Sequence, residues 1–134
     1  EAYAADRADR VQTTPNLGAK RYFSAVTAAD VVIGNSSSGV IEAPFLGTPV
    51  VNVGSRQDGR LRAPAVIDCA TKHENIVDAV RQALSPDMRV RAARKETPYG
   101  RGDSARLIVE ALKSADTASL PRKTFHDIHP EVTA

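Results

Sequence analysis

The chain has 134 residues, a net charge of +2 and one cysteine, and 42% of its residues are apolar. These values are typical of a soluble globular domain, and the dispersed Lys and Arg residues exclude the clustered basic face that nucleic-acid binding requires. No apolar run is long enough to span a membrane, and the lone thiol of Cys69 cannot form an internal disulfide. Composition therefore predicts one cytoplasmic domain that binds neither nucleic acid nor membrane.

The first thirty residues predict two helices and a strand. The chain begins EAYAADRADR, without Met and with a helix-like composition. We therefore expect a piece of a longer protein that starts partway through a helix, which ends near residue 9. A short strand is predicted over 11–15, and a helix over 19–29 with Tyr22 and Val26 on one face.

Three short apolar runs rich in β-branched residues are typical of buried parallel strands. They are DVVI at 30–33, VVNV at 50–53 and AVIDC at 65–69. Residues 38–46, between the first two runs, predict a short helix that Gly47 and Pro49 close. Pro44 within this segment predicts a kinked or very short helix, because proline cannot donate the helical hydrogen bond.

Two further helices are predicted after the third run. Thr71 and Glu74 have the spacing of a capping box. The apolar residues of the helix that follows recur with helical period, at Ile76, Val77, Val80 and Leu84. Ser85 and Pro86 then begin another helix as its cap and first-turn proline.

The last helix is predicted over 104–113, after a loop at 97–103. The loop contains an RGD tripeptide, which we interpret as a coincidence, with Asp103 as the helix cap. The apolar face of this helix is Leu107, Ile108, Ala111 and Leu112. We expect a domain over 1–114 and an extended tail over 115–134.

Strands that alternate with helices through short links predict an α/β fold, a parallel sheet with helices on both faces. In such sheets, ligands bind beyond the carboxyl ends of the strands. Three polar stretches fall at that edge. They are TPNLG at 14–18, GNSSSG at 34–39 and GSRQDGR at 54–60.

The serine-rich stretch joins a strand to a helix whose first N–H groups have no partner within the helix. These groups and the helix dipole attract an anion, and small hydroxyl side chains add donors without blocking its approach. The candidates for a phosphate or diphosphate site are Ser36, Ser37, Ser38 and Gly39. Serine is also a common helix cap, so capping without a ligand is the alternative.

Glu42 and Arg56 are the charged candidates near this stretch. Glu42 is the reciprocal partner of a cap at Gly39, complements the helix dipole, or accepts both hydroxyls of a ribose beside the diphosphate. Arg56 follows the second strand at the same edge, where its guanidinium either holds phosphate oxygens or is solvated. For Arg60 and Arg62 we expect solvated side chains.

The sequence predicts no metal site and no cofactor. The histidines are His73, His126 and His129. None has an Asp or Cys partner at metal-ligand spacing. Cys69 ends a predicted strand, where we expect a structural role.

The stretch IGNSSSGVIEAPFLGTPVVNVGSRQDGR, at 33–60, resembles the C-terminal domain of the hydrolysing UDP-N-acetylglucosamine 2-epimerases. The segments LGAKRYFSAVTAADVVIGNSSSG, TPYGRGDSA and KTFHDI are also similar to that family, so the resemblance covers about positions 11–129. The sibling non-hydrolysing epimerases have a shorter SGG turn and an extra glutamate where this chain has SSSGVIE.

The resemblance implies a Rossmann-like parallel sheet with flanking helices, which is the C-terminal, UDP-binding half of a two-domain glycosyltransferase-B fold without its first strand. The roles that it implies are diphosphate binding by Ser36, Ser37, Gly39 and Arg56, and ribose binding by Glu42, with Asn35 and Ser38 as additional candidates. The implied partner is UDP or a UDP-N-acetylhexosamine. The exposed edge of an incomplete sheet predicts pairing with a second copy, a homo-oligomer.

Members of this family remove the proton at sugar carbon 2 and eliminate UDP, which leaves a glycal. Water then adds to give N-acetylmannosamine in sialic-acid-type biosynthesis. The acid and base residues would lie in a domain that this chain lacks, so no catalytic residue is predicted and the chain alone is expected to be inactive. The alternatives are a UDP-sugar glycosyltransferase of the same fold and a non-catalytic nucleotide-binding domain.

Overall fold

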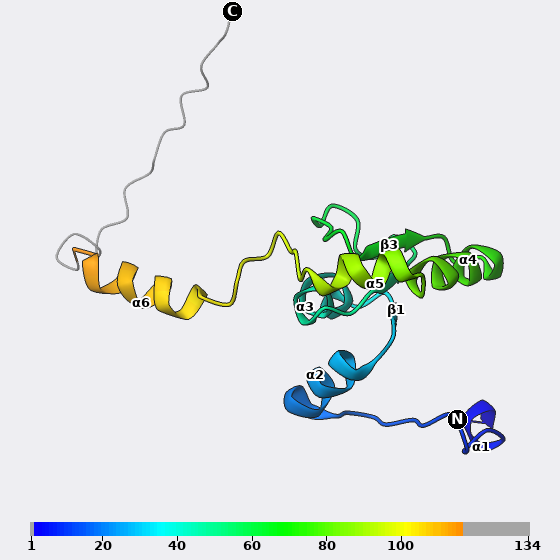
Figure 1. The fold of residues 1–134 in the computed structure, drawn as a ribbon. Helices are drawn as coiled ribbons and strands as arrows, with labels where there is room; N and C mark the ends of the chain where they lie inside the picture. Colours follow the sequence, from blue (N-terminus) through cyan, green and yellow to red (C-terminus); the bar gives the residue numbers. More distant parts are fainter. Residues whose placement is uncertain (1, 117–134) are drawn as a thin grey trace, which may run out of the picture. The chain divides into compact units, whose positions relative to one another are not determined.

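The computed structural model describes residues 2–116 (Figure 1). Two compact units divide the chain, one up to Arg101 and one from Gly102 on. The elements of the first unit are α1 (Ala2–Ala5), α2 (Gly18–Ala28), β1 (Val32–Gly34), α3 (Ser37–Leu46), β2 (Val50–Val53), β3 (Val66–Cys69), α4 (His73–Ala83) and α5 (Pro86–Ala93). The second unit contains α6 (Ser104–Ser114). None of the described helices is long and apolar enough to cross a membrane.

The sheet consists of three parallel strands in the order β1-β2-β3. Val50 of the central strand aligns with Val32 of β1 on one side and with Val66 of β3 on the other. The parallel α/β arrangement predicted from the sequence is confirmed, and β2 has the predicted bounds. Its valines Val50 and Val51 are at most 1% exposed, because neighbouring strands and helices cover them on every side.

Helices cover both faces of the sheet because side chains alternate along a strand. Val50 packs with Val26 of α2 and Ala43 of α3 on one face. Val51, the next residue, packs on the other face with Ala79 and Ala83 of α4. The core is therefore two thin apolar layers, one on each side of β2.

The prediction of a fully buried first strand is wrong for β1. Its central residue, Ile33, is 50% exposed. β1 is an edge strand, with β2 as its only neighbour among the described strands. An edge strand leaves one row of backbone groups without a strand partner, and among the described residues no strand lies on this side of β1.

The strand predicted over 11–15 does not form, and α1 ends at Ala5, before residue 9. Residues 12–15 are exposed. A strand needs a neighbour for its backbone hydrogen bonds and a face to bury. The sequence QTTP at these positions offers no apolar side chain to a core beyond the proline ring, so the segment is an exposed connection.

The capping box predicted for α4 is also wrong. The N-cap is Lys72, which makes no side-chain capping bond, and Thr71 lies one residue too early. A Cβ added to Gly54 would lie 3.2 Å from the Thr71 Cγ2 atom, so Thr71 packs against the backbone after β2. The most buried face of α4 consists of the small residues Ala79 and Ala83, which let the helix approach the sheet closely.

The ends of the other helices follow local signals. α3 continues past Pro44, which is buried, and ends at Gly47 with a φ of 91°, in the left-handed region that glycine favours. The Ser85 Oγ accepts a bond of 3.2 Å from the N–H of Met88 and caps α5, as predicted. α6 has the predicted position. Asp103 is its N-cap residue but makes no side-chain capping bond, and its carboxylate lies 3.5 Å from the Arg106 guanidinium.

Candidate functional site

The serine loop, residues 34–39, is the short connection between β1 and α3. Only Asn35 and Ser36 separate the two elements. Ser36 is the N-cap of α3, and its Oγ accepts a hydrogen bond of 3.3 Å from the N–H of Ser38. The hydroxyl of Ser36 therefore caps the helix, as one of the two sequence-based alternatives proposed.

Three backbone N–H groups of this loop have no acceptor within the described part of the chain. They belong to Asn35, Ser36 and Ser37. The N–H of Gly39, by contrast, donates to the Ser36 carbonyl at 3.1 Å. Free N–H groups at the start of a helix attract an anion, since the helix dipole adds positive potential there. The serine loop thus offers the donors that a phosphate group requires.

Gly39 serves the packing of α3 on the sheet. It is buried, and a Cβ added to it would lie 3.4 Å from the Val50 Cγ1 atom and 3.9 Å from the Val32 Cγ1 atom. A single methyl group would make an ordinary contact at these distances, whereas a branched side chain would be crowded, so a small residue here lets the first turn of α3 lie close to β1 and β2. This contact sets the distance between the serine loop and the sheet edge.

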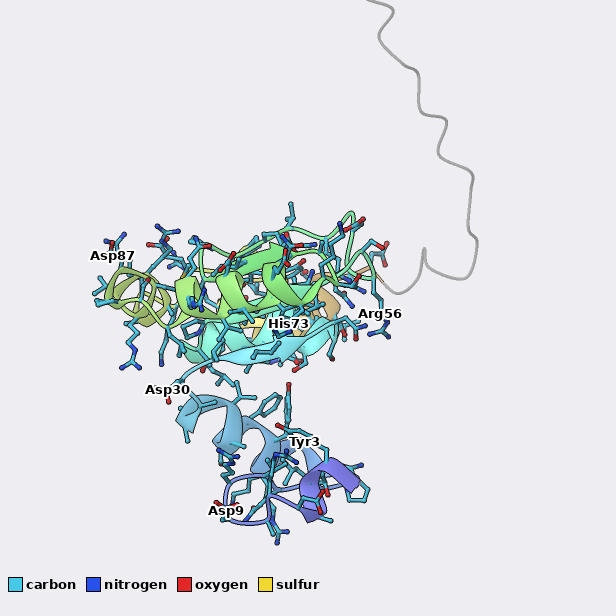
Figure 2. All side chains as sticks on the ribbon, turned by 90° about the vertical axis from the view of Figure 1, so that its right-hand side faces the viewer. Tyr3, Asp9, Asp30, Arg56, His73 and Asp87 are labelled. Atoms are coloured by element: carbon cyan, nitrogen blue, oxygen red, sulfur yellow. The ribbon has the colours of Figure 1, made fainter. Side chains whose placement is uncertain are left out.

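The arginine loop, residues 54–62, supplies positive charge to the same edge. The Arg56 Nη1 atom donates to the Asn35 carbonyl at 2.9 Å, and the Gln57 Nε2 atom donates to the same oxygen at 2.7 Å. Two of the three predicted stretches therefore meet. Figure 2 shows Arg56 at one end of the sheet layer and Asp30 at the other.

Gln57 was missed by sequence reasoning. Its side chain is only 3% exposed, whereas Arg56 beside it is exposed. The signal in the sequence was weak, since glutamine in a polar, glycine-punctuated loop is normally solvated. Its Oε1 atom is buried without a partner in the described residues, so the hydrogen bond from Nε2 to the Asn35 carbonyl is the one that the Gln57 side chain makes among them.

Glu42 stands one turn above the start of α3 and is half-buried. No ion pair or hydrogen bond engages its carboxylate among the described residues. The N-cap is Ser36, so the alternative of Glu42 as the partner of a cap at Gly39 is excluded. Glu42 lies four residues after Ser38, and residues with this spacing share one face of a helix. Its carboxylate therefore stands available on the side of Ser38.

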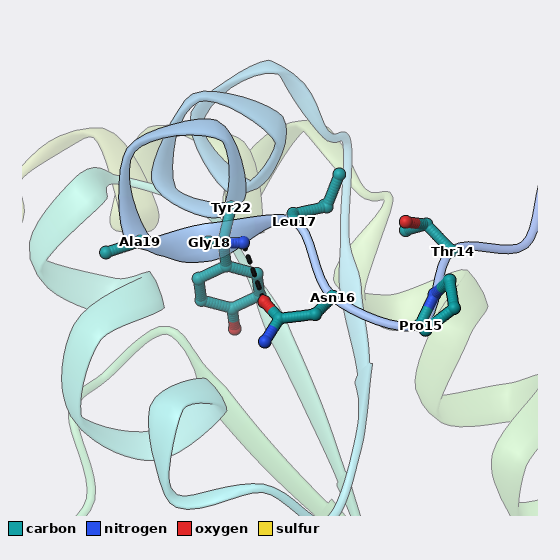
Figure 3. A pocket seen from close by; sticks show the side chains of 7 residues that line it. All are labelled: Thr14, Pro15, Asn16, Leu17, Gly18, Ala19 and Tyr22. Atoms are coloured by element: carbon teal, nitrogen blue, oxygen red, sulfur yellow. Dashed lines mark hydrogen bonds between the residues drawn. The ribbon is translucent and has the colours of Figure 1, made fainter.

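No strand precedes the stretch TPNLG, and its link to the serine loop is through Tyr22 of α2. The Tyr22 hydroxyl is 2.7 Å from the Ser38 Oγ atom. Tyr22 also lines a pocket of about 420 Å³ with residues 14–19. Figure 3 shows this pocket, with the Asn16 Oδ1 atom accepting a bond of 2.7 Å from the N–H of Gly18. All three predicted stretches therefore lie around the start of α3.

The expectation of a solvated Arg62 is wrong. Its Nε atom donates to both carboxylate oxygens of Asp68, at 3.0 and 2.9 Å, and its Nη1 atom donates to the carbonyls of Gln57 and Arg60. One guanidinium thus joins the end of the arginine loop to β3 and to the middle of the loop itself. A planar group with several fixed donors can do this, whereas a lysine cannot.

Asp68 is held from a second side by Asn52, its neighbour in the strand register. The Asn52 Nδ2 atom donates to the Asp68 Oδ1 atom at 2.6 Å, and Asn52 is 1% exposed. Burial raises the pKa of Asp68, but the hydrogen bonds from Arg62 and Asn52 and the charge of Arg62 outweigh it, so the pKa is lowered. The carboxylate is therefore stabilised in its charged form.

The remaining titratable candidates contribute little to this edge. Cys69 is a free, half-buried thiol that packs beside the Val51 cluster, and burial, with the charge of Asp68, raises its pKa. His73 is exposed at the start of α4. Within the described residues, no three His, Cys, Asp or Glu side chains gather as metal ligands. His126 and His129 lie outside the described residues.

A parallel three-stranded sheet with helices on both faces, and with polar loops meeting at its carboxyl edge, defines a Rossmann-like α/β domain. A family model described as UDP-N-acetylglucosamine 2-epimerase matches residues 2–113. The chain therefore belongs to the UDP-N-acetylglucosamine 2-epimerase family, and the resemblance seen in its sequence is confirmed.

Three curated relatives extend this comparison. A GDP/UDP-N,N'-diacetylbacillosamine 2-epimerase (hydrolyzing) of Campylobacter jejuni is 44% identical over 66 residues, 49% of this chain and 17% of that protein. A UDP-N,N'-diacetylbacillosamine 2-epimerase (hydrolyzing) of Legionella pneumophila is 34% identical over 104 residues, 78% of this chain and 26% of that protein. A polysialic acid biosynthesis protein of Escherichia coli is 30% identical over 122 residues, 88% of this chain and 30% of that protein. The matched region is thus at most 30% of the length of each relative.

Proposed function

We propose that this chain is the UDP-binding half of a hydrolysing UDP-N-acetylglucosamine 2-epimerase with a glycosyltransferase-B fold. The observation that carries the proposal is the convergence of donors at the start of α3. Three unpaired N–H groups of the serine loop stand where the guanidinium of Arg56 is bound to the carbonyl of Asn35. Backbone donors and a positive charge on one turn suit a diphosphate.

Each candidate has a role in this proposal. Ser36, Ser37 and Arg56 hold the diphosphate, and Asn35 adds its unpaired N–H group. Ser38 takes part through its hydroxyl, which Tyr22 orients. Gly39 keeps the turn close to the sheet and acts on the ligand only indirectly, since its N–H is already bonded. The unengaged carboxylate of Glu42 accepts the ribose hydroxyls.

The chemistry of this half is the stabilisation of a leaving group. When the proton at sugar carbon 2 is removed and the carbon–oxygen bond to UDP breaks, negative charge develops on the diphosphate. Donors and a cation that are already in place stabilise that charge more than water does, which is a large catalytic effect. The groups that move protons, and the water that adds to the glycal, belong to parts of the protein outside this chain, so the isolated chain is inactive.

The relatives named for diacetylbacillosamine and for polysialic acid biosynthesis support UDP-linked N-acetylated sugars as the substrate class. In this proposal, the residues of this chain bind the UDP part that such substrates share. We therefore place the choice between sugars in the part of the protein that this chain does not contain.

A non-catalytic domain whose serine loop only caps a helix is the second candidate. The hydrogen bond from the Ser38 N–H to the Ser36 Oγ atom favours this second candidate, because it gives the Ser36 hydroxyl a capping role that needs no ligand. It leaves the N–H groups of Asn35 to Ser37 and the carboxylate of Glu42 unexplained. The two candidates differ in whether the loop responds to a nucleotide.

A titration of the isotope-labelled chain with UDP, followed by amide NMR, separates the two. The proposal expects shifts at Asn35–Ser37, Glu42 and Arg56. Arg56→Ala should weaken UDP binding about tenfold or more, since it removes a charged hydrogen-bond donor. Arg60→Ala is the matched control, because Arg60 lies in the same loop with its side chain exposed. No shifts at millimolar UDP, or equal losses in both variants, would contradict the proposal.

A further inference from the structure

The arginine loop is long, and its backbone N–H groups make only local bonds or a bond to β3. The Gly54 N–H donates to the Cys69 carbonyl at 2.8 Å, and two turn bonds run from Asp58 to Ser55 at 2.9 Å and from Arg60 to Gln57 at 3.3 Å. Near the end of the loop, the Tyr99 hydroxyl donates to the Leu61 carbonyl at 2.9 Å. Gly54 and Gly59 both have positive φ angles, of 77° and 79°. None of these backbone bonds reaches the serine loop. Side-chain contacts therefore place Arg56 beside it.

We propose that Arg62 and Asp68 are positioning residues for the diphosphate site. The ion pair between them fixes the arginine loop, and the loop in turn fixes the Asn35 peptide through Gln57 and Arg56. The inference rests on the proposed function, since it assigns the residues that hold the diphosphate-binding groups of that same site in position. None of the resemblance-based roles includes either residue.

The first link of this chain of contacts is the ion pair itself. Arg62 contacts Asp68 through Nε at 2.9 Å, and its side chain is 23% exposed. The aspartate cannot turn away, because the buried Nδ2 atom of Asn52 holds it at 2.6 Å from the central strand. The ion pair therefore anchors the guanidinium to the sheet.

The second link runs from the guanidinium to the loop backbone. The Arg62 Nη1 atom donates to the Gln57 carbonyl at 2.9 Å and to the Arg60 carbonyl at 2.7 Å. The Gln57 carbonyl lies in the turn over residues 55–58 that also carries Arg56, and the Arg60 carbonyl lies in the turn that follows. The guanidinium, which the ion pair holds on the sheet, thus fixes the position of these loop carbonyls relative to β3.

The third link reaches the serine loop. Gln57 and Arg56 donate two hydrogen bonds to one acceptor, the carbonyl of Asn35. That carbonyl and the N–H of Ser36 belong to the same planar peptide group. Bonds that fix the direction of the carbonyl therefore also fix the direction of the Ser36 N–H, which is one of the three unpaired donors.

The test compares Arg62→Lys with Arg89→Lys in the 134-residue chain. Arg89 makes a similar ion pair with Asp30, at 3.0 Å, and Figure 2 shows Asp30 at the far end of the sheet from Arg56. The probes are UDP and uridine, because uridine has no diphosphate. We expect Arg62→Lys to lower the ratio of UDP affinity to uridine affinity about tenfold, the size of coupling found within one hydrogen-bond network. Arg89→Lys should leave the ratio unchanged.

Two further variants sharpen this test. Asp68→Asn keeps the size of the side chain but removes its charge, so it should lower the same ratio. The double variant Arg62→Lys/Gln57→Ala should lose no more than the larger of the two single losses, because both residues act through the Asn35 carbonyl. Additive losses would show that Arg62 acts by another route and would overturn the inference.

The ligand-free spectra keep the inference separate from the proposed function. Arg62→Lys should move the amide resonances of Asn35, Ser36 and Ser37, while Arg89→Lys should not. A wild-type chain that does not respond to UDP contradicts the proposed function, and unchanged loop resonances in Arg62→Lys contradict the positioning role. Equal losses for UDP and uridine would show general destabilisation and would also overturn it.

Discussion

The serine loop and the arginine loop meet at one edge of the sheet but are fixed in different ways. The serine loop has two residues between β1 and α3, so the fold itself fixes where it lies. The arginine loop has nine residues, and the side chains of Arg62 and Gln57 hold it in place. The position of the short loop is thus fixed by the packing beneath it, whereas the position of the long loop is fixed by individual polar contacts.

The largest effect on the free energy of unfolding is expected from a substitution at Gly39, where the start of α3 packs on the sheet. Gly39→Val adds a branched side chain 3.4 Å from the Val50 Cγ1 atom and should lower the free energy of unfolding by about 2 kcal/mol. Urea denaturation would measure it. Gly39→Ala is the matched control, since its single methyl group makes an ordinary contact there. A fall of equal size in both variants would show that packing against β2 is not the cause.

The capping bond of the serine loop comes next. Ser36→Ala removes the acceptor of the Ser38 N–H and should cost about 1 kcal/mol of stability. Ser37→Ala serves as the control, because no hydrogen bond from the Ser37 hydroxyl is found in the described part of the chain. Thermal and urea unfolding would both report the difference. Equal stability of the two variants would remove the capping role of Ser36.

A smaller effect is expected at the contact between α2 and the serine loop. Tyr22→Phe removes one hydrogen bond, to the Ser38 Oγ atom, and should cost about 0.5–1 kcal/mol. Tyr3→Phe is the comparison, since the Tyr3 ring lies against Arg7 and its hydroxyl has no partner in the described residues. If Tyr22→Phe also shifts UDP affinity while Tyr3→Phe does not, the α2 contact supports the ligand loop as well as the fold.

The smallest effect concerns pH and the arginine loop. The folded-state pKa of Asp68 lies below its ordinary value of 3.8. The stabilisation from its charged form is therefore complete above that value and is lost as the pH falls through the folded-state pKa. Unfolding measured from pH 7 down to pH 3 should show the stability gap between the wild type and Asp68→Asn narrowing at the acid end. A gap that stays constant would contradict the charge-based role of Asp68.

Sequence reasoning succeeded where the signal is local. The bounds of β2 follow from a four-residue run with three valines, and the cap of α5 follows from Ser85 before a proline. The serine loop was found in the same way, from small residues between a strand and a helix. Each of these depends on neighbours along the chain, which the sequence shows directly.

Prediction from the sequence failed where the structure of a segment, or the partner of a side chain, depends on a residue that is not its close neighbour along the chain. The predicted strand at 11–15 lacks a neighbouring strand, and Thr71 packs on Gly54 where a capping role was expected. Arg62 looked solvated because nothing in its surroundings along the chain marks Asp68, six residues later, as its partner. The packing role of Gly39 depends on Val50 in the same way.

The polar pair between Asn52 and Asp68 has a consequence for how the strands find each other. β2 and β3 are otherwise almost entirely apolar, as VVNV and VIDC, and such strands offer little to distinguish one alignment from the next. In the native alignment the two polar residues stand opposite each other. A slip by one residue would leave the buried amide of Asn52 facing Ile67 or Cys69, at a cost of several kcal/mol. We therefore expect the Asn52–Asp68 pair to make misaligned pairing of β2 and β3 less stable than the native register while the sheet assembles.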